Sequence, residues 1–453
     1  MKHCRHRLLI VESATIARSI AALHLPGLEV LATGGYAWLP QVAHDATGKP
    51  ELKARANPED KHRRFRNALK AAAQPATEIV IATDPDPSGG FIASCIARFL
   101  KHDARLRRGY LSRLSAPSVQ QLMEAAVPLD QAASASTSEA LRQYFIHRQK
   151  RRSAAREELS ARGLPIPAGS DPAALALTRS RLRSANARNF IVTLRNNDGH
   201  PIHLQTPGPI PVPDSPLALS AMPPDTSPLY PALPQPLSAA CIGAFLPSAL
   251  KTQHYDGLQR QLNLLFSIPP EKASAPISYP RAGARAWTAE NWEQLSASLM
   301  RFERAGAELL RPNALRQRHV LGPDAGHQGL HITDFAQTPH HMRRFLKPPA
   351  LALYQYIYDG TRAALCYPPA LPPARLLHDT AGRIFYTETA ADAQKLRGKT
   401  LSVRPFVPLA DLLQSLLDSG RVKASSLGKT ADALCKCPWL RFHHAPVPHL
   451  RCR

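Results

Sequence analysis

A tyrosine stands beside guanidinium groups in the stretch PISYPRAGARAW, residues 276–287. Tyr279 is followed by Pro280, and Arg281 and Arg285 come close behind. A phenol has a pKa of about 10 and attacks poorly at neutral pH unless nearby groups stabilise its anion. Because Pro280 fixes its own φ and restricts the residue before it, we expect Tyr279 in an extended or turn segment. The pattern indicates a nucleophile, and an ordinary half-buried ring is the alternative.

Acidic side chains follow two apolar runs near the N-terminus. The run LLIV ends at Glu12, and the run EIVIA leads into DPDPSGG with Asp84 and Asp86. If the two runs are neighbouring parallel strands, the three carboxylates meet at the edge where open α/β sheets bind ligands. Like charges this close need a cation, and oxygen-only ligands suit Mg²⁺. The alternative is that Asp84 and Asp86 only form turns around the neighbouring prolines.

The elements that would position these residues alternate along residues 1–125. Apolar runs predict strands at 8–11, 29–32, 79–82 and 110–114. Helical periodicity predicts helices over 16–23, 61–73 and 92–100, and a further helix that starts at Ser115 and Pro117. This rhythm is typical of a parallel sheet covered by helices.

The rest of the chain predicts helical blocks interleaved with small β pieces. Helices are expected over 136–188, over most of 244–350 and over 406–434, and hairpins over 190–204 and around 379–382. Residues 207–236 contain eleven prolines. We expect that segment to be an extended linker that contains neither a helix nor a central strand.

The charge balance points to a polyanionic partner. Lys and Arg number 57 against 34 Asp and Glu, a formal net charge of +23. Nucleic acid is the default partner for such a protein. Two basic runs lie in the helical region 136–188, and we expect a phosphate-facing surface rather than a merely solvated face. The residues assigned to it are Arg148, Lys150, Arg151, Arg152, Arg179 and Arg183.

Other sequence features narrow the location and the metal content. No run of 18 apolar residues exists and no signal peptide is evident, so we expect a cytoplasmic, nucleoid-associated protein without a membrane contact. Seven cysteines are scattered along the chain. Cys435, Cys437 and Cys452 lack the paired spacing of a zinc ribbon, which favours reduced thiols over a metal site. The high content of Ala, Arg and Pro is consistent with a GC-rich bacterial genome.

Several stretches resemble type IA DNA topoisomerases, and the topoisomerase III branch in particular. LLIVESATIARSIAALHLPGLEVLATGGYAWLP and IVIATDPDPSGGFIASCI resemble their Toprim domain, and ISYPRAGARAWTAENW resembles their active-site tyrosine motif. Weaker likenesses follow in the family's order: AFLPSALKTQ (244–253), HQGLHIT (327–333) and LLDSGRVKASSLGKTADAL (416–434). Their order and spacing make the resemblance specific.

The resemblance implies a fold and a reaction. The fold is multidomain α/β plus α, a Toprim domain with helical domains and a β-rich arch that close a ring around DNA. The reaction is ATP-independent cleavage and religation of single-stranded DNA through a 5′-phosphotyrosine, and the chain has no G-x-x-x-x-G-K-[ST] loop for ATP.

The resemblance also implies roles for particular residues. Tyr279 would be the nucleophile and Arg281 would stabilise charge on the phosphate. Glu12 would be the acid or base at the 3′ oxygen, and Asp84 and Asp86 would place Mg²⁺ with it. His327 would contact a phosphate or the surroundings of the tyrosine. Arg285, Arg421 and Ser425 complete the expected DNA contacts.

The sequence departs from the family pattern at several positions. Pro87 and Ser88 replace an arginine and a third carboxylate, and Ser13 replaces a lysine. Ala282 and Gly283 replace a serine–aspartate pair. The segment 168–177 lacks the family's arginine and glutamine, and C-terminal zinc ribbons are absent. These departures leave a second reading open, a catalytically impaired relative that binds single-stranded DNA as an accessory factor. A Toprim-type nuclease or primase-like activity is a third.

The predicted organisation assigns each part of the chain to a domain. We expect a Toprim domain at 1–130, a helical DNA-binding domain at 131–188, the β arch at 189–243 and 349–405 with the Pro-rich linker at 207–236, the Tyr279-bearing helical domain at 244–348, and its second part with a basic tail at 406–453. The expected partners are single-stranded DNA and a helicase or other DNA-processing protein, and the expected state is a monomer.

Overall fold

The computed structural model divides the chain into two compact units. Unit 1 comprises Met1–Lys150, Gln259–Ser298 and Val320–Tyr358, and unit 2 comprises Arg151–Leu258, Leu299–His319 and Asp359–Arg453. The structure describes residues 6–44, 46–47, 50–84, 87–111, 114–129, 151–168, 170–183, 192–195, 201–206, 217–226, 229, 234–249, 261–262, 264–267, 275–280, 282–303, 310, 320–321, 327–367, 370–387, 389–397, 400–404, 407–419, 422, 427–443 and 449–452.

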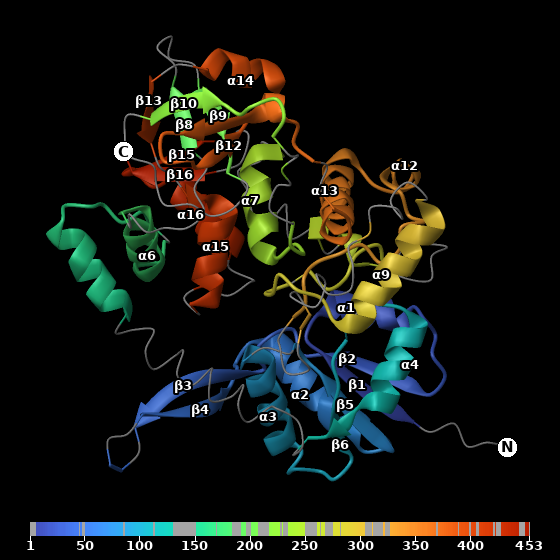
Figure 1. Cartoon of the computed structure of the whole chain (residues 1–453). Coiled ribbons are helices and arrows are strands. Elements are labelled where there is room, and N and C mark those ends of the chain that lie inside the picture. Colours follow the sequence, from blue (N-terminus) through green and yellow to red (C-terminus); the bar gives the residue numbers. More distant parts are fainter. Residues whose placement is uncertain are drawn as a thin grey trace. The chain divides into compact units, whose positions relative to one another are not determined.

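A twisted, mostly parallel sheet is the centre of unit 1 (Figure 1). Its strands are β1 (Arg7–Val11), β2 (Leu28–Ala32), β5 (Glu78–Ala82), β6 (Leu106–Arg108) and β7 (Val127–Pro128), in the order β2-β1-β5-β6-β7. β1 pairs in parallel with β2 and β5, and β5 pairs in parallel with β6. The carboxyl ends of these four strands therefore share one edge, as the sequence predicts for β1 and β5.

Helices cover the sheet because its central strands β1 and β5 are apolar over four consecutive residues and must be buried on both faces. α1 (Ala14–Ala21), α2 (Asp60–Ala73), α3 (Pro87–Phe99) and α4 (Ala116–Ala125) follow the predicted rhythm. Ile10 and Ile81 pack in one cluster with side chains of α2 and α3. Val80 points to the other face of the sheet, where Val80 and Leu122 of α4 both lie close to Gly109. The side chains of Ser13 and Ser115 cap α1 and α4 by accepting backbone N–H groups.

Two features of this region differ from the predictions. The strand predicted at 110–114 is wrong: the strand is β6, Leu106–Arg108, and it was overlooked because two of its three residues are arginines. A hairpin of β3 (Trp38–His44) and β4 (Pro50–Ala56) was also not predicted. It extends from the sheet in Figure 1. Its prolines and charged residues give no apolar alternation over its length.

The second half of unit 1 carries the remaining helices and an irregular segment. α9 (Ala289–Phe302) and α13 (Pro348–Leu365) begin in unit 1, and α12 (Pro339–Met342) lies between them along the chain. The segment 275–286 runs beside 327–333 without forming a regular strand, held by an isolated bridge between Ile277 and Ile332. The predicted interruption of the helical pattern at ISYPR is confirmed.

Unit 2 contains a sheet of six strands that closes on itself. The strands are β8 (Val192–Arg195), β9 (Pro201–Leu204), β10 (Leu217–Ala221), β11 (Leu376–Asp379), β12 (Ile384–Tyr386) and β13 (Thr400–Arg404), in the order β12-β11-β10-β13-β8-β9. Gln205 and Tyr386 exchange backbone hydrogen bonds of 3.0 and 2.8 Å and so join the two edge strands. Leu219, Leu377 and Phe385 belong to the cluster of buried side chains in this sheet.

The predicted hairpins β8–β9 and β11–β12 are confirmed, but the reading of the Pro-rich segment as a linker is wrong. β10 lies in that segment and pairs with β11 on one side and β13 on the other, so it is a central strand. Its five residues LALSA contain no proline, and flanking prolines at 216 and 223 leave its N–H groups intact.

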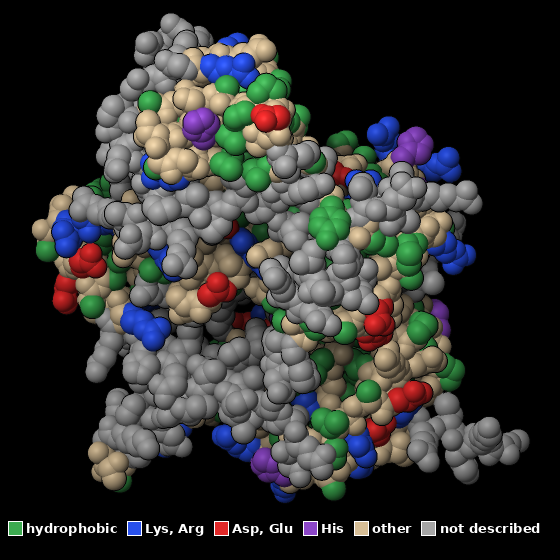
Figure 2. Space-filling view, in the orientation of Figure 1, with side chains coloured by type: hydrophobic (Ala, Val, Ile, Leu, Met, Phe, Trp, Pro, Cys, Tyr) green, Lys and Arg blue, Asp and Glu red, His purple; other side chains and the backbone are tan. Residues whose placement is uncertain are grey.

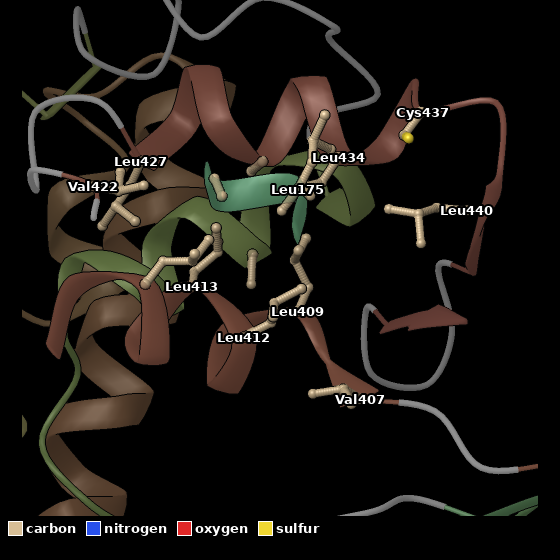
Figure 3. Packing of buried hydrophobic residues seen from close by; sticks show 14 of the residues in the cluster. Leu175, Val407, Leu409, Leu412, Leu413, Val422, Leu427, Leu434, Cys437 and Leu440 are labelled. Carbon is tan, nitrogen blue, oxygen red and sulfur yellow. The ribbon is translucent and has the colours of Figure 1, made fainter. Parts of the chain in front are cut away.

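A helical cluster forms the second core of unit 2. Its helices are α6 (Pro172–Arg183), α7 (Ala239–Ala249), α15 (Leu409–Asp418) and α16 (Leu427–Cys435). Figure 3 shows Leu175, Leu412, Leu413 and Leu434 pointing toward one another from three of these helices. The closing helical segment predicted at 406–434 is confirmed.

Short strands surround this cluster, and part of the predicted basic tail folds. β14 (Val407–Pro408), β15 (Leu440–His443) and β16 (His449–Cys452) form a small antiparallel sheet, so residues beyond 434 contribute ordered strands. The 3₁₀ helix η2 (Pro373–Arg375) and α14 (Ala390–Leu396) flank the strands of the closed sheet.

Within the part of the chain that the structure describes, no helix combines the length and apolar character that crossing a bilayer requires.

Candidate active site

The site begins with two neighbouring loops at the carboxyl edge of the unit 1 sheet. Glu12 follows β1 directly, and Asp84 comes two residues after the end of β5. Val11 pairs with Ala82 across the two strands, which brings both loops to the same edge. The backbone N–H of Gly34, after β2, donates to the Glu12 carbonyl over 3.0 Å. The expected convergence of these loops therefore follows from strand register.

A buried arginine fixes the backbone of the Asp84 loop. Arg108, at the end of β6, is 2% exposed, and its guanidinium donates to the Ile81 carbonyl over 2.8 Å and to the Asp84 carbonyl over 3.0 Å. Hydrogen bonds between a charged donor and backbone carbonyls are stronger than neutral ones. Arg108 therefore ties the end of β5 and the following loop to one rigid group.

Gly89 and Thr83 close the same loop from the helix side. The hydroxyl of Thr83 donates to the Gly89 carbonyl over 2.8 Å. A Cβ placed on Gly89 would lie 2.0 Å from the Asp84 carbonyl oxygen, which no real Cβ approaches. A glycine is therefore required where the start of α3 meets Asp84.

Tyr279 reaches this loop from a distant part of the chain. The N–H of Ala275 donates to the Leu114 carbonyl over 3.1 Å, which fastens the tyrosine segment beside α4. Ser278 donates its N–H to the His331 carbonyl over 2.9 Å and accepts the His331 N–H on its hydroxyl over 3.1 Å. These bonds hold Tyr279 in an extended segment, as Pro280 predicts.

The phenol of Tyr279 contacts the carboxylate of Asp84. The hydroxyl lies 2.9 Å from both Oδ1 and Oδ2, so its single proton is shared between two acceptors. Both residues are mostly buried, at 9% and 6% exposure. A nucleophile hydrogen-bonded to a base is the arrangement that covalent catalysis needs.

Two rings hold the phenol in place. Phe266 lies edge-on to the Tyr279 ring, with centroids 5.4 Å apart. His327 lies more nearly parallel to it, with centroids 4.6 Å apart, and its Nε2 is 3.8 Å from Asp84 Oδ2. At that distance Nε2 and the carboxylate form an ion pair when the imidazole is protonated but not a hydrogen bond. Asp84, Tyr279 and His327 form one compact group, hereafter the tyrosine–aspartate site.

The other predicted site residues fall into two sets. Asp86, Arg281, Arg148, Lys150, Arg421 and Ser425 lie outside the described residues. Of the remaining ones, Glu12 is at the neighbouring loop and Arg285 is half-buried five residues beyond Pro280.

The described arginines of the basic runs belong to unit 2. Arg151 is exposed, Arg152 lies 3.7 Å from the carboxylate of Asp171, and Arg183 ends α6. Arg179 is 8% exposed, and its guanidinium lies 3.5 Å from Glu158. That position does not suit the exposed phosphate contact predicted for Arg179, because burial beside a carboxylate removes it from solvent. DNA contacts by the other arginines stay a prediction.

Sequence reasoning missed the groups that support Asp84. Arg108 carries no signal, because a charge in a run of arginines is expected at the surface. The Gly89–Gly90 pair directly after the acidic loop was a usable signal of a close backbone approach. Ser88 departs from the family's acidic motif, and its hydroxyl accepts the Tyr36 hydroxyl over 2.8 Å and so joins α3 to the loop after β2.

Comparison with known proteins gives a likeness of fold. No protein-family profile and no curated protein matches the chain. Among solved structures, full-length topoisomerase I from Thermotoga maritima is similar, with a TM-score of 0.57 and 15% sequence identity. The similarity covers 97% of this chain and 80% of that one. The chain has a mixed α/β fold like that of a topoisomerase.

Proposed function

We propose that this protein is a type IA DNA topoisomerase, which cuts and rejoins one DNA strand through Tyr279. The observation that carries the proposal is the hydrogen bond from the Tyr279 hydroxyl to the Asp84 carboxylate, made between residues 195 positions apart. The topoisomerase-like fold and the net charge of +23 support it. The ring of domains around DNA is part of the proposal.

The chemistry follows from the groups present. In cleavage the Tyr279 oxygen bonds to the phosphorus, its proton passes to Asp84, and the bond from phosphorus to the 3′ oxygen breaks. Glu12 would give that leaving oxygen a proton. Religation reverses each step: the 3′ hydroxyl attacks, the phenolate leaves and takes back the proton from Asp84. The phosphodiester energy is kept in the phosphotyrosine, so no ATP is needed.

Electrostatics would make the phenol reactive. Charge that develops on the phosphate needs fixed donors nearby, and Arg281 is the residue proposed for this task. His327, stacked on the Tyr279 ring, would keep the ring oriented and, when protonated, would place a positive charge beside the Asp84 carboxylate.

Mg²⁺ is part of the proposal and would be held by Asp84, Asp86 and Glu12. Carboxylate oxygens are ligands of the right kind, and the ion would neutralise phosphate charge when bound. The described residues supply only part of this set: they include no group of three His, Cys, Asp or Glu side chains that would hold a metal, and Asp86 is not among them. The steps above are therefore assigned to side chains alone.

A covalent-trapping experiment tests the function. Protein mixed with negatively supercoiled plasmid and Mg²⁺ should relax it, and denaturant quenching should leave DNA attached to Tyr279. Tyr279→Phe keeps the packing against Phe266 and His327 but removes the nucleophile, so both signals should vanish while single-strand binding stays within a few-fold. The control is Tyr354→Phe, which removes a different buried hydroxyl, one that donates to the Gln337 carbonyl over 2.6 Å.

Two outcomes would count against the proposal. Equal relaxation by wild type and Tyr279→Phe excludes Tyr279 as the nucleophile. No trapping by the wild type with any divalent metal favours the second candidate, an accessory factor that binds single-stranded DNA without cutting it. The Tyr36–Ser88 bond favours that candidate, because a hydroxyl pair stands where a third carboxylate is expected.

A further inference from the structure

An exposed aromatic ring stands beside the tyrosine–aspartate site. Tyr110 follows β6 by two residues, and β6 runs parallel to β5, so Tyr110 leaves the sheet at the same edge as Asp84. The side chain of Tyr110 is large and apolar over most of its area, yet the residue is 44% exposed. The mechanism proposed above gives it no task.

The Tyr110 ring rests on a fixed cation. The guanidinium carbon of Arg108 lies 4.5 Å from the ring centroid, a cation–π contact. The same guanidinium is held by the carbonyls of Ile81 and Asp84, and Arg108 is 2% exposed. One face of the ring therefore packs on a buried guanidinium, which cannot move without losing its hydrogen bonds to the Ile81 and Asp84 carbonyls.

This support places the ring beside the Asp84 loop. A single guanidinium contacts both the Tyr110 ring and the Asp84 carbonyl, so the ring neighbours the residue that accepts the Tyr279 hydroxyl. A flat aromatic surface next to a phosphate site is how proteins hold unpaired strands, because every base has a face that stacks.

We propose that Tyr110 is a stacking platform for an unpaired base adjacent to the phosphate that Tyr279 attacks. The ligand is single-stranded DNA, and the contact is tolerant of base identity because no hydrogen-bonding edge is read. The inference rests on the proposed function for the identity of the neighbouring phosphate. The stacking contact itself does not depend on cleavage.

Base-analogue fluorescence tests the platform with the full-length protein. Oligonucleotides that carry 2-aminopurine at successive positions report stacking as a loss of emission. The 2-aminopurine emission at one position should be quenched strongly by wild type and by Tyr110→Phe, which keeps the ring. Tyr110→Ala should not quench it. Tyr110→Ala should also weaken oligonucleotide binding by about 5-fold to 100-fold.

Phe99→Ala is the matched control. Phe99 is an aromatic residue of similar exposure, 37%, at the C-terminal end of α3, away from the acidic loop at the start of that helix. It should leave the quenching unchanged. Circular dichroism and melting temperature are measured for every variant, and Tyr110→Leu replaces Tyr110→Ala if the latter does not fold.

The outcomes separate this inference from the proposed function. Unchanged quenching and affinity in folded Tyr110→Ala or Tyr110→Leu would overturn the platform, as would failure of the wild type to bind any oligonucleotide. Covalent trapping by wild type, with quenching and affinity that do not depend on Tyr110, supports the topoisomerase proposal and rejects the platform. Tyr110-dependent quenching without any trapping supports the platform and rejects strand cleavage through Tyr279.

Discussion

Two close contacts with its backbone carbonyl hold Asp84 in place. The start of α3 lies against the Asp84 carbonyl so closely that only a hydrogen fits on the Gly89 Cα. The guanidinium of Arg108 donates to the same carbonyl over 3.0 Å. The backbone of the residue whose carboxylate accepts the Tyr279 hydrogen bond is therefore held by Gly89 and Arg108.

Gly89→Ala is expected to damage the site through this contact. The added methyl forces the helix start and the Asp84 carbonyl apart, which should lower the free energy of unfolding by about 1–3 kcal/mol and reduce covalent trapping more than single-strand binding. Urea unfolding and quenched cleavage assays measure the two effects. Gly283→Ala is the control, since a Cβ there meets no atom within 4 Å. Equal behaviour of the two variants would refute the close-approach argument.

At the scale of elements, a buried histidine links α2 to the loop after β2. His62 is 2% exposed, and its Nδ1 lies 3.2 Å from the Thr33 carbonyl, which requires the ring nitrogen to donate. Burial is the main reason why the pKa of His62 is lowered, and the charge of Lys61 adds to the effect, while Thr33 and Glu59 oppose it. Thr33 in turn donates its N–H to the Val11 carbonyl, just before Glu12.

The lowered pKa gives stability a definite pH dependence. The unfolded chain, with an ordinary histidine pKa of about 6.5, binds a proton more readily than the folded one, so stability should fall as pH drops through that value. Urea unfolding between pH 5 and pH 8 should show a steeper loss for wild type than for His62→Gln, which keeps a donor for Thr33 but does not titrate. Parallel pH profiles for the two proteins would contradict this account.

Elements were predictable from the sequence where one local signal dominated. The apolar runs of β1 and β5 and the capping Ser115 of α4 gave correct elements because burial and capping act on neighbouring residues. β6 and β10 were misread because pairing with distant strands outweighs two arginines in one and flanking prolines in the other. The contact of Tyr279 with Asp84 joins distant residues, and only the resemblance of separate motifs predicted it.

At the scale of the whole molecule, positive charge exceeds negative charge by 23. Figure 2 shows Lys and Arg side chains at many places on the visible face, among fewer acidic ones. A strand that contacts such a surface displaces its own counterions. Binding should therefore depend on ionic strength far more than on base sequence.

A salt titration measures that dependence. The logarithm of the affinity for a short single-stranded oligonucleotide should fall linearly with the logarithm of NaCl concentration, with a slope of about 0.7 for each phosphate neutralised. Fluorescence anisotropy between 50 and 300 mM NaCl should show a loss of roughly 10-fold or more. Affinity that stays constant over this range would contradict a mainly electrostatic interface.

The strand order of the closed sheet has a consequence for synthesis of the chain. β10 has partners only in β11 and β13, which lie more than 150 residues further along the chain. While the ribosome is still translating residues 222–375, neither strand that pairs with β10 has been made. Both edges of β10 therefore lack their native partners during this time. The closed sheet can be completed only after residue 404, the last residue of β13, has left the exit tunnel.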